Sequence, residues 1–157
     1  MTNFAKARAL ALITPLALLA GAYGFQYIGG LVPCELCWWQ RYAHAAALGL
    51  AITSLTMGGQ RIWVGLAGLA LLAAAAIGGF HAGVEYGWWK GFTECTTTVK
   101  FGAGADALSA IMAAPVIRCD VVQWKMFGIS MAGYDFLVSG AVALTIFALL
   151  ARKEKVA

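Results

Sequence analysis

The apolar runs of this chain restrict its fold more than any other feature, because each is as long as a bilayer is thick. The hydrocarbon core measures about 30 Å, which about 20 helical residues cross. Four stretches meet that length, at about residues 9–28, 40–57, 62–84 and 132–151. Hydrophobic residues make up 62% of the chain and charged residues only 11%, which leaves little length for a separate soluble domain. We therefore expect an all-α membrane protein, a four-transmembrane-helix bundle forming one domain over residues 1–157.

The first run also has features of a cleaved signal peptide. Lys6 and Arg8 precede an apolar core, and small residues stand at positions 20–22. The run nevertheless continues through Tyr23 to Ile28, which is longer than a usual signal core. We therefore expect this segment to remain as the first membrane span.

The basic residues indicate how four spans would be oriented. One side would carry six basic residues and one acid, namely Lys6, Arg8, Arg61, Arg152, Lys153 and Lys155 with Glu154. The other side would carry five basic residues and six acids, namely Arg41, Lys90, Lys100, Arg118 and Lys125 with Glu35, Glu85, Glu94, Asp106, Asp120 and Asp135. The positive-inside rule then places both termini in the cytoplasm and the loops at about 29–39 and 85–131 outside. In a bacterium these loops would lie in the periplasm, on the outer side of the inner membrane.

All four cysteines fall in the two outer loops, at Cys34, Cys37, Cys95 and Cys119. Disulfides persist in the periplasm, and an even count is consistent with two of them, although four cysteines allow three pairings. The second outer loop is also expected to hold a short helix at residues 106–112, lying on the membrane surface.

The first outer loop carries the segment Pro33-Cys34-Glu35-Leu36-Cys37-Trp38-Trp39-Gln40-Arg41. Thiol reactivity requires the thiolate, which a helix N-terminus and a nearby cation both stabilise. Cys37 is expected at the start of the second helix, and Arg41 lies one turn further on the same face. This arrangement favours a redox-active dithiol with Cys37 as its thiolate.

Two other interpretations of the cysteines remain open. All four could bind a metal ion, although the spacing between the last two fits no familiar zinc motif, and we expect no metal. Both pairs could also be structural disulfides, with Arg41 only extending toward the lipid headgroups. We favour the redox interpretation because of the motif and the oxidising compartment.

Three ionisable residues lie near the outer ends of the last two helices. His81 and Glu85 are one turn apart, at a depth where an ionisable residue is a functional candidate by default. We interpret Asp135 as an interfacial acid without a functional role. For both His81 and Glu85 the alternative is a side chain that is simply solvated at the interface, and the role of Glu85 stays open.

These features resemble the DsbB family of bacterial inner-membrane disulfide-forming proteins, and the resemblance covers nearly the whole chain. Its most specific parts are the segment from Pro33 to Arg41 and Pro115-Val116-Ile117-Arg118-Cys119-Asp120. The residues from Trp124 to Ala132, which include Phe127-Gly128-Ile129-Ser130, are also similar.

The resemblance implies a thiol–quinone oxidoreductase. A Cys95–Cys119 disulfide would oxidise a periplasmic DsbA-like thiol oxidase, with Cys95 forming the mixed disulfide. The Cys34–Cys37 pair would reoxidise it and pass two electrons to ubiquinone or menaquinone, with Cys37 facing the quinone and Arg41 holding it. With a quinone as the ligand, we expect His81 to contribute to its binding site. The expected partners are therefore this oxidase, membrane quinone and lipid, and no nucleic acid.

Overall fold

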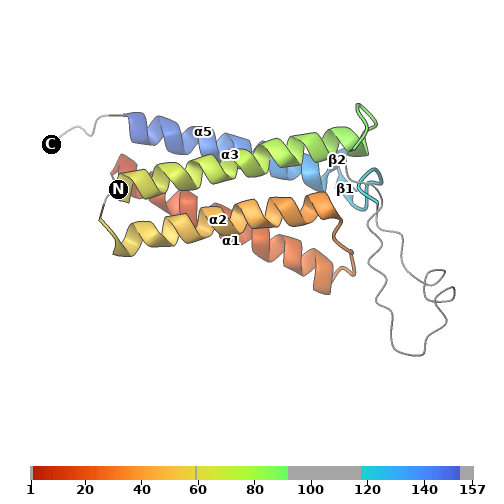
Figure 1. Cartoon of the computed structure of the whole chain (residues 1–157), viewed down its shortest axis with the longest axis horizontal. Helices are drawn as coiled ribbons and strands as arrows, with labels where there is room; N and C mark the ends of the chain where they lie inside the picture. Colours follow the sequence, from red (N-terminus) through yellow and green to blue (C-terminus); the bar gives the residue numbers. More distant parts are fainter. Residues whose placement is uncertain (1, 59, 92–117, 153–157) are drawn as a thin grey trace.

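The computed structural model describes residues 2–58, 60–91 and 118–152. In these residues it contains four long helices: α1 (Asn3–Tyr27), α2 (Glu35–Thr56), α3 (Gln60–Glu85) and α5 (Met131–Ala151). Successive helices run in opposite directions, so the start of α1 and the end of α5 lie at the same end of the bundle (Figure 1). The expected helix at 106–112 lies outside the described residues.

Short polar or thiol side chains cap three of these helices. The Thr2 hydroxyl accepts a hydrogen bond from the amide of Ala5 at 3.1 Å, and Ser130 Oγ accepts one from Gly133 at 3.1 Å. At the start of α2 the Cys34 sulfur takes this role, accepting from the amide of Cys37 at 3.4 Å. Such caps satisfy amides that have no partner inside the helix. The cap at Cys34 fixes the first thiol at the positive end of the α2 dipole.

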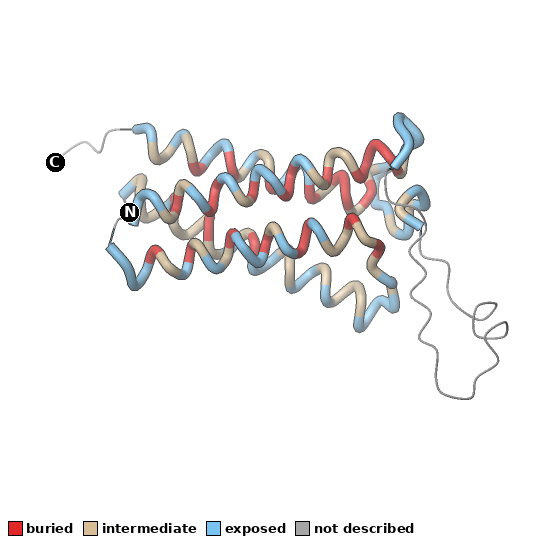
Figure 2. Tube along the Cα trace, in the orientation of Figure 1, coloured by how far each residue is buried: buried red, intermediate tan, exposed pale blue. Residues whose placement is uncertain are grey.

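The helices form a closed bundle in which α3 packs against α2 and α5, and α1 packs against the same two helices from the other side. Buried residues face the interior, while the outer faces are exposed (Figure 2). Gly78 allows the close approach of α3 to α5, because an added Cβ would lie 3.0 Å from the backbone nitrogen of Phe136. Small residues at such contacts are typical of membrane helices.

Three of the helices, α1, α3 and α5, are long and apolar enough to cross a membrane. Their outer faces carry large exposed apolar side chains, such as Ile13, Leu69 and Leu144. Lipid would cover such faces, whereas water would not stabilise them. The predicted all-helical membrane protein is confirmed at this level. Helix α2 has 22 residues, but polar side chains including Gln40 and His44 lower its apolar character.

A small hairpin that the sequence analysis did not predict lies near the start of α5. Strand β1 (Lys125–Met126) pairs antiparallel with β2 (Ile129–Ser130). Phe127 and Gly128 form its turn with φ values of 49° and 80°, as a two-residue hairpin turn requires. The Tyr86 hydroxyl accepts from the Ser130 amide at 2.8 Å and donates to the Gly128 carbonyl at 3.0 Å. These bonds anchor the hairpin to the end of α3.

Candidate functional site

The two thiols of the first outer segment are in contact. The Cys34 thiol donates to the Cys37 sulfur across 3.0 Å, and Cys34 is only 3% exposed. No disulfide joins the two residues in the structure. Their separation follows from the capped first turn of α2, which brings residues i and i+3 onto one side of the helix. The structure thus brings together the Cys-x-x-Cys pair as a hydrogen-bonded dithiol.

Cys119 also reaches this pair, although it is distant in sequence. Its side chain forms a hydrogen bond with that of Cys34. The segment around it is held against the first outer loop, because the Gln123 amide donates to the Val32 carbonyl at 2.9 Å. The ring of Trp124 also packs on Phe25 of α1, with centroids 5.1 Å apart. One cysteine of the second outer loop therefore lies beside the first pair, whereas Cys95 lies outside the described residues.

The hydrogen bonds distinguish the two thiols of the pair, both of which precede the expected second span. The bonds with Cys119 and Cys37, together with burial, raise the pKa of the Cys34 thiol. The hydrogen bond from Cys34 lowers the pKa of Cys37, because it stabilises the Cys37 thiolate more than burial destabilises it. In the reduced pair Cys37 is therefore the thiol that ionises first, and Cys34 is the one that keeps its proton longer.

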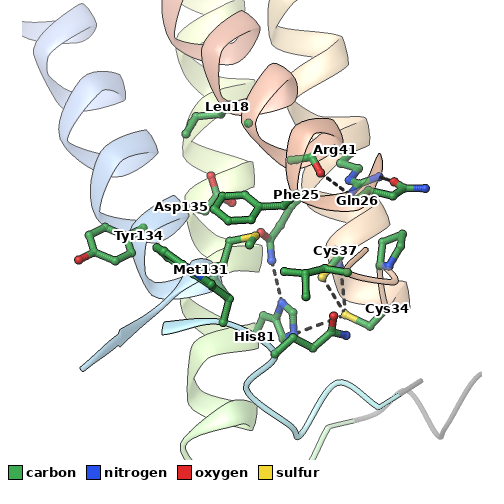
Figure 3. A pocket seen from close by; sticks show the side chains of 18 of the residues that line it. Leu18, Phe25, Gln26, Cys34, Cys37, Arg41, His81, Met131, Tyr134 and Asp135 are labelled. Atoms are coloured by element: carbon green, nitrogen blue, oxygen red, sulfur yellow. Dashed lines mark hydrogen bonds between the residues drawn. The ribbon is translucent and has the colours of Figure 1, made fainter. Parts of the chain in front are cut away.

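His81 of α3 contacts the dithiol from the opposite side. Its Nε2 lies 3.5 Å from the Cys34 sulfur, and its Nδ1 lies 3.0 Å from the amide nitrogen of Gln40 (Figure 3). Because an amide nitrogen can only donate, Nδ1 accepts and the ring proton sits on Nε2, facing the sulfur. Oε1 of Glu85 lies 3.9 Å from the same Nε2. Gln40 thus orients the histidine, a role that the sequence analysis did not predict.

Arg41 is buried, with 7% of its surface exposed. Its guanidinium donates to the Gln26 side-chain carbonyl and, at 3.1 Å, to the backbone carbonyl of Ala22, both on α1. It also lies over the rings of Tyr23 and Trp38, 4.8 and 5.0 Å from their centroids. These contacts direct the guanidinium toward α1, so it is fixed in the bundle instead of extending to the headgroups.

A cavity of about 280 Å³ adjoins the dithiol and is lined by residues of all four helices. One wall, from α1, is apolar and consists of Ala17, Leu18, Leu19, Gly21, Ala22 and Phe25. The opposite side is polar and reactive, with Cys34, Cys37, Gln40, Arg41, His44, His81, Glu85 and Asp135. Figure 3 shows several of these side chains converging on one space. Such a site suits a flat apolar molecule that carries a few hydrogen-bond acceptors.

A buried pair of ionisable residues lies in the same wall. Nε2 of His44 is 2.7 Å from Oδ1 of Asp135, and Ser139 Oγ donates to that oxygen at 2.9 Å. Asp135 is only 8% exposed and His44 only 3%, so the carboxylate does not sit in the water interface. The sequence analysis missed His44 entirely. The signal was present, because an ionisable residue inside an apolar run is a functional candidate.

The ligand atoms of Cys34, Cys37 and His81 all lie within 4.8 Å of one another. Two thiolates and an imidazole at that spacing could bind a soft metal ion such as Zn²⁺. The same contacts also suit thiol–disulfide chemistry.

Comparison with known proteins decides which family has this arrangement. The family model "Disulfide bond formation protein DsbB" matches residues 5–149. The chain belongs to the DsbB family. A Disulfide bond formation protein B of Aromatoleum aromaticum is 32% identical, over 98% of this chain and 99% of that protein. One from Verminephrobacter eiseniae is 32% identical over 92% of this chain and 86% of its own.

Another DsbB relative, from Herminiimonas arsenicoxydans, is 37% identical over 73% of this chain and 80% of its own length. No solved structure matches the chain. Membership confirms the family predicted from the Pro33–Arg41 segment and identifies a membrane-spanning oxidoreductase of disulfide bond formation.

Proposed function

We propose that this DsbB-family protein reoxidises a periplasmic DsbA-like thiol oxidase and transfers the electrons to membrane quinone. The observation that carries this proposal is the juxtaposition of three groups at one point. These are the Cys34–Cys37 dithiol, Cys119 from the second outer loop, and a cavity with an apolar wall. A dithiol at the edge of an apolar cavity can exchange with a soluble protein on one side and with a lipid-soluble oxidant on the other.

The contact between Cys119 and Cys34 supports a relay between the two cysteine pairs. In this relay a Cys95–Cys119 disulfide oxidises the partner dithiol, and Cys95 forms the mixed disulfide. The reduced pair then attacks the Cys34–Cys37 disulfide, so one disulfide forms as the other breaks and two electrons move to Cys34 and Cys37. Such exchange requires sulfur atoms in contact, and the hydrogen bond between Cys119 and Cys34 provides this contact.

The cavity fits a quinone ring by its chemistry. Its α1 wall would contact the apolar ring and tail, Arg41 would hold a carbonyl oxygen, and His81 would line the cavity beside the ring. His44 Nδ1 is buried without a hydrogen-bond partner among the described residues, so the wall also offers a polar atom for such an oxygen. A bound ubiquinone or menaquinone supplies the capacity to accept two electrons and two protons.

Within that site each residue has a separate task. Cys37 presents the thiolate, which its hydrogen bond from Cys34 stabilises. His81 places its Nε2 proton against Cys34, and Gln40 keeps the imidazole in that tautomer. Arg41 is held rigidly by α1, so its positive charge stays fixed beside the cavity.

The proposal includes four spans, with α2 as the fourth, in the bacterial inner membrane. The spans would lie at about 9–28, 40–57, 62–84 and 132–151 in a single domain, with both termini in the cytoplasm. Supporting this, the helices alternate in direction, which places the Cys34 loop and the β1–β2 hairpin at the same end of the bundle (Figure 1). A membrane-impermeant maleimide should label cysteines introduced at residues 29–31 and not at Gly58 in intact spheroplasts.

The direct test is turnover of the purified protein in detergent with a reduced thioredoxin-fold oxidase and ubiquinone-1. We expect ubiquinone-1 to be consumed in equal amount to the disulfide formed on the partner. Cys95→Ala should stop oxidation of the partner while its Cys34–Cys37 pair still reacts with ubiquinone-1. Unchanged turnover in this variant would contradict the relay, and a wild-type protein that consumes no quinone would contradict the whole proposal.

A metal site is the second candidate, favoured by the clustering of Cys34, Cys37 and His81. In that case the thiols would hold an ion structurally and would not exchange with a partner. Equilibrium dialysis of the reduced protein against Zn²⁺ separates the candidates. A metal-binding protein would retain one ion per chain and lose thermal stability on chelation, whereas an oxidoreductase would turn over fully in chelator.

A further inference from the structure

The electron path proposed above leaves one proton unaccounted for. A pair consisting of the Cys34 thiol and the Cys37 thiolate yields a disulfide, two electrons and one proton. Reduction of a quinone to a quinol takes up two electrons and two protons. An ionisable group that lines the cavity can supply the second proton directly to the ring.

The His44–Asp135 pair lines the cavity and has the arrangement of an imidazole proton donor held by a carboxylate. Nε2 of His44 is engaged by the Asp135 carboxylate at 2.7 Å, which leaves Nδ1 as the ring nitrogen that is not bound to this carboxylate. Nδ1 and the Asp135 Oδ2 are buried without hydrogen-bond partners among the residues that the structure describes, and both residues line the cavity. A carboxylate on one ring nitrogen orients an imidazole and stabilises its protonated form, so that the other nitrogen can donate.

Packing supports the same interpretation. Gly78 of α3 gives space to this carboxylate, because an added Cβ would lie 3.1 Å from Oδ2 of Asp135. Ser139, one turn further on α5, donates to Oδ1 and fixes its direction. A pair that served only to join α2 to α5 would have hydrogen-bond partners for all its polar atoms within the helix contact. In this pair one polar atom of each residue has no such partner among the described residues, namely His44 Nδ1 and Asp135 Oδ2.

Two other ionisable groups of the cavity are less suited to this role, and a third is a rival. Both ring nitrogens of His81 have partners, since Nε2 faces the Cys34 sulfur and Nδ1 accepts from Gln40. Its proton is therefore directed at the dithiol and not at a quinone. Arg41 does not release a proton at any physiological pH. Glu85 is the remaining rival, because its Oε2 is also buried without a partner in the described part of the chain.

We propose that His44, held by Asp135, donates the second proton of quinone reduction through its Nδ1. This inference rests on the proposed function and adds a catalytic residue to it. In balance, the Cys34 thiol, the Cys37 thiolate, the His44 imidazolium and a quinone give the Cys34–Cys37 disulfide, neutral His44 and a quinol. His44 then regains one proton from water in each cycle, and Asp135 acts as its positioning residue.

The test uses single-turnover reoxidation of the prereduced full-length protein by ubiquinone-1, with binding measured separately. His44→Asn and Asp135→Asn keep a polar side chain of similar size, and we expect each to bind ubiquinone-1 within about threefold of wild type. We expect His44→Asn to slow reoxidation by about 100-fold or more, as loss of a general acid does. Ser54→Ala is the matched control, because Ser54 is a fully buried polar residue of α2 outside the cavity and its loss should leave the rate unchanged.

Chemical rescue separates proton donation from packing. His44→Ala leaves space for a small azole, and imidazole should restore reoxidation at least about threefold, since it can carry a donated proton. Pyrazole has the same size but hardly binds a proton at neutral pH, so it should not rescue. Equal rescue by both azoles would show that His44 only fills space and would overturn the proposal.

A spectroscopic measurement tests the donor without any quinone. In the ¹⁵N spectrum of histidine-labelled protein, the signals of His44 are identified by their loss in His44→Asn. In wild type these signals should show protons on both ring nitrogens of His44. In Asp135→Asn they should show a proton on only one. A neutral His44 in wild type would contradict the proposal, as would a full loss of rate in Glu85→Gln alone. A wild type that does not react with ubiquinone-1 would instead remove the proposed function itself.

Discussion

The Cys34 sulfur lies 3.5 Å from Nε2 of His81, although 47 residues separate the two in sequence. This contact joins the N-terminus of α2 to the outer end of α3 and places a proton-bearing nitrogen on the less acidic thiol of the pair. Since Gln40 fixes the tautomer from the other side, Nε2 keeps its proton and donates it toward the Cys34 sulfur.

Replacing His81 should therefore affect the dithiol more than the second cysteine pair. We expect His81→Phe to slow reoxidation of Cys34–Cys37 by ubiquinone-1 by about 10- to 100-fold, because the Cys34 sulfur loses the Nε2–H donor that would stabilise its thiolate. Oxidation of the partner by a preformed Cys95–Cys119 disulfide should proceed in a single turnover at the wild-type rate. Rapid-mixing measurement of both half-reactions checks this, and equal losses in both would show a general folding defect.

Gln40→Leu gives a milder test of the same contact. It removes the amide that donates to His81 Nδ1 but preserves the volume of the side chain. The reoxidation rate should fall by about three- to tenfold, which is the cost of an unfixed tautomer worth about 1 kcal/mol. A rate unchanged from wild type would mean that the tautomer is fixed by another group.

The pH dependence of labelling should distinguish the two thiols. The lowered pKa of Cys37 means that its thiolate persists at pH values where an ordinary thiol is protonated. With the reduced protein at pH 6 to 7, iodoacetamide should therefore modify Cys37 before Cys34, whose pKa is raised. Cys34→Ala removes the stabilising hydrogen bond, so labelling of Cys37 should require a higher pH. Mass spectrometry of the peptides reads the site, and preferential labelling of Cys34 would contradict the assignment.

Sequence reasoning could predict those parts of the site that one segment contains. The apolar runs and helix-capping residues are local, so the long helices and the position of Cys37 in the first turn of α2 could be anticipated. Contacts between distant segments could not. The approach of Cys119 to Cys34 depends on Tyr86 and Gln123, and no pattern in the chain links these residues.

The pair of His44 and Asp135 shows the same limit in the membrane interior. Each lies in a separate apolar run, 91 residues apart, and the depth of each could be estimated from its position in the helix. That they meet depends on the rotation of α2 and α5 about their axes, which Gly78 and the neighbouring small residues determine by packing. Asp135 was accordingly misread as an interfacial acid.

The contacts of Arg41 predict an asymmetric response to substitution. Lysine keeps the charge but cannot donate to Gln26 and Ala22 in the same geometry, nor cover the two aromatic rings as a planar group. We expect Arg41→Lys to raise the KM for ubiquinone-1 by about tenfold and Arg41→Ala to raise it further, each with a smaller effect on the KM for the partner oxidase. Steady-state kinetics with each substrate varied checks this, and equal effects on both would indicate a merely structural arginine.

The hairpin anchor offers a last prediction, on the meeting of the two outer loops. Tyr86→Phe removes both hydrogen bonds that hold the hairpin to α3, at a cost of about 1 to 3 kcal/mol. Because the hairpin leads back to Cys119, this cysteine should spend less time beside Cys34. In a background of Cys37→Ala and Cys95→Ala, the rate at which mild oxidant joins the remaining two cysteines should fall by about 5- to 150-fold, as that cost implies.

Tyr42→Phe is the control for the hairpin experiment, because Tyr42 is an exposed tyrosine on α2. In this variant the disulfide between Cys34 and Cys119 should form as fast as in the parent protein, as measured by mass spectrometry of the linked peptides. Single-turnover reoxidation by ubiquinone-1 in the otherwise intact Tyr86→Phe protein should remain near wild type, since the cavity residues are unchanged. If Tyr86→Phe joins the two cysteines at the parent rate, the hairpin does not position Cys119, and the contact with Cys34 must come from the remainder of the second outer loop.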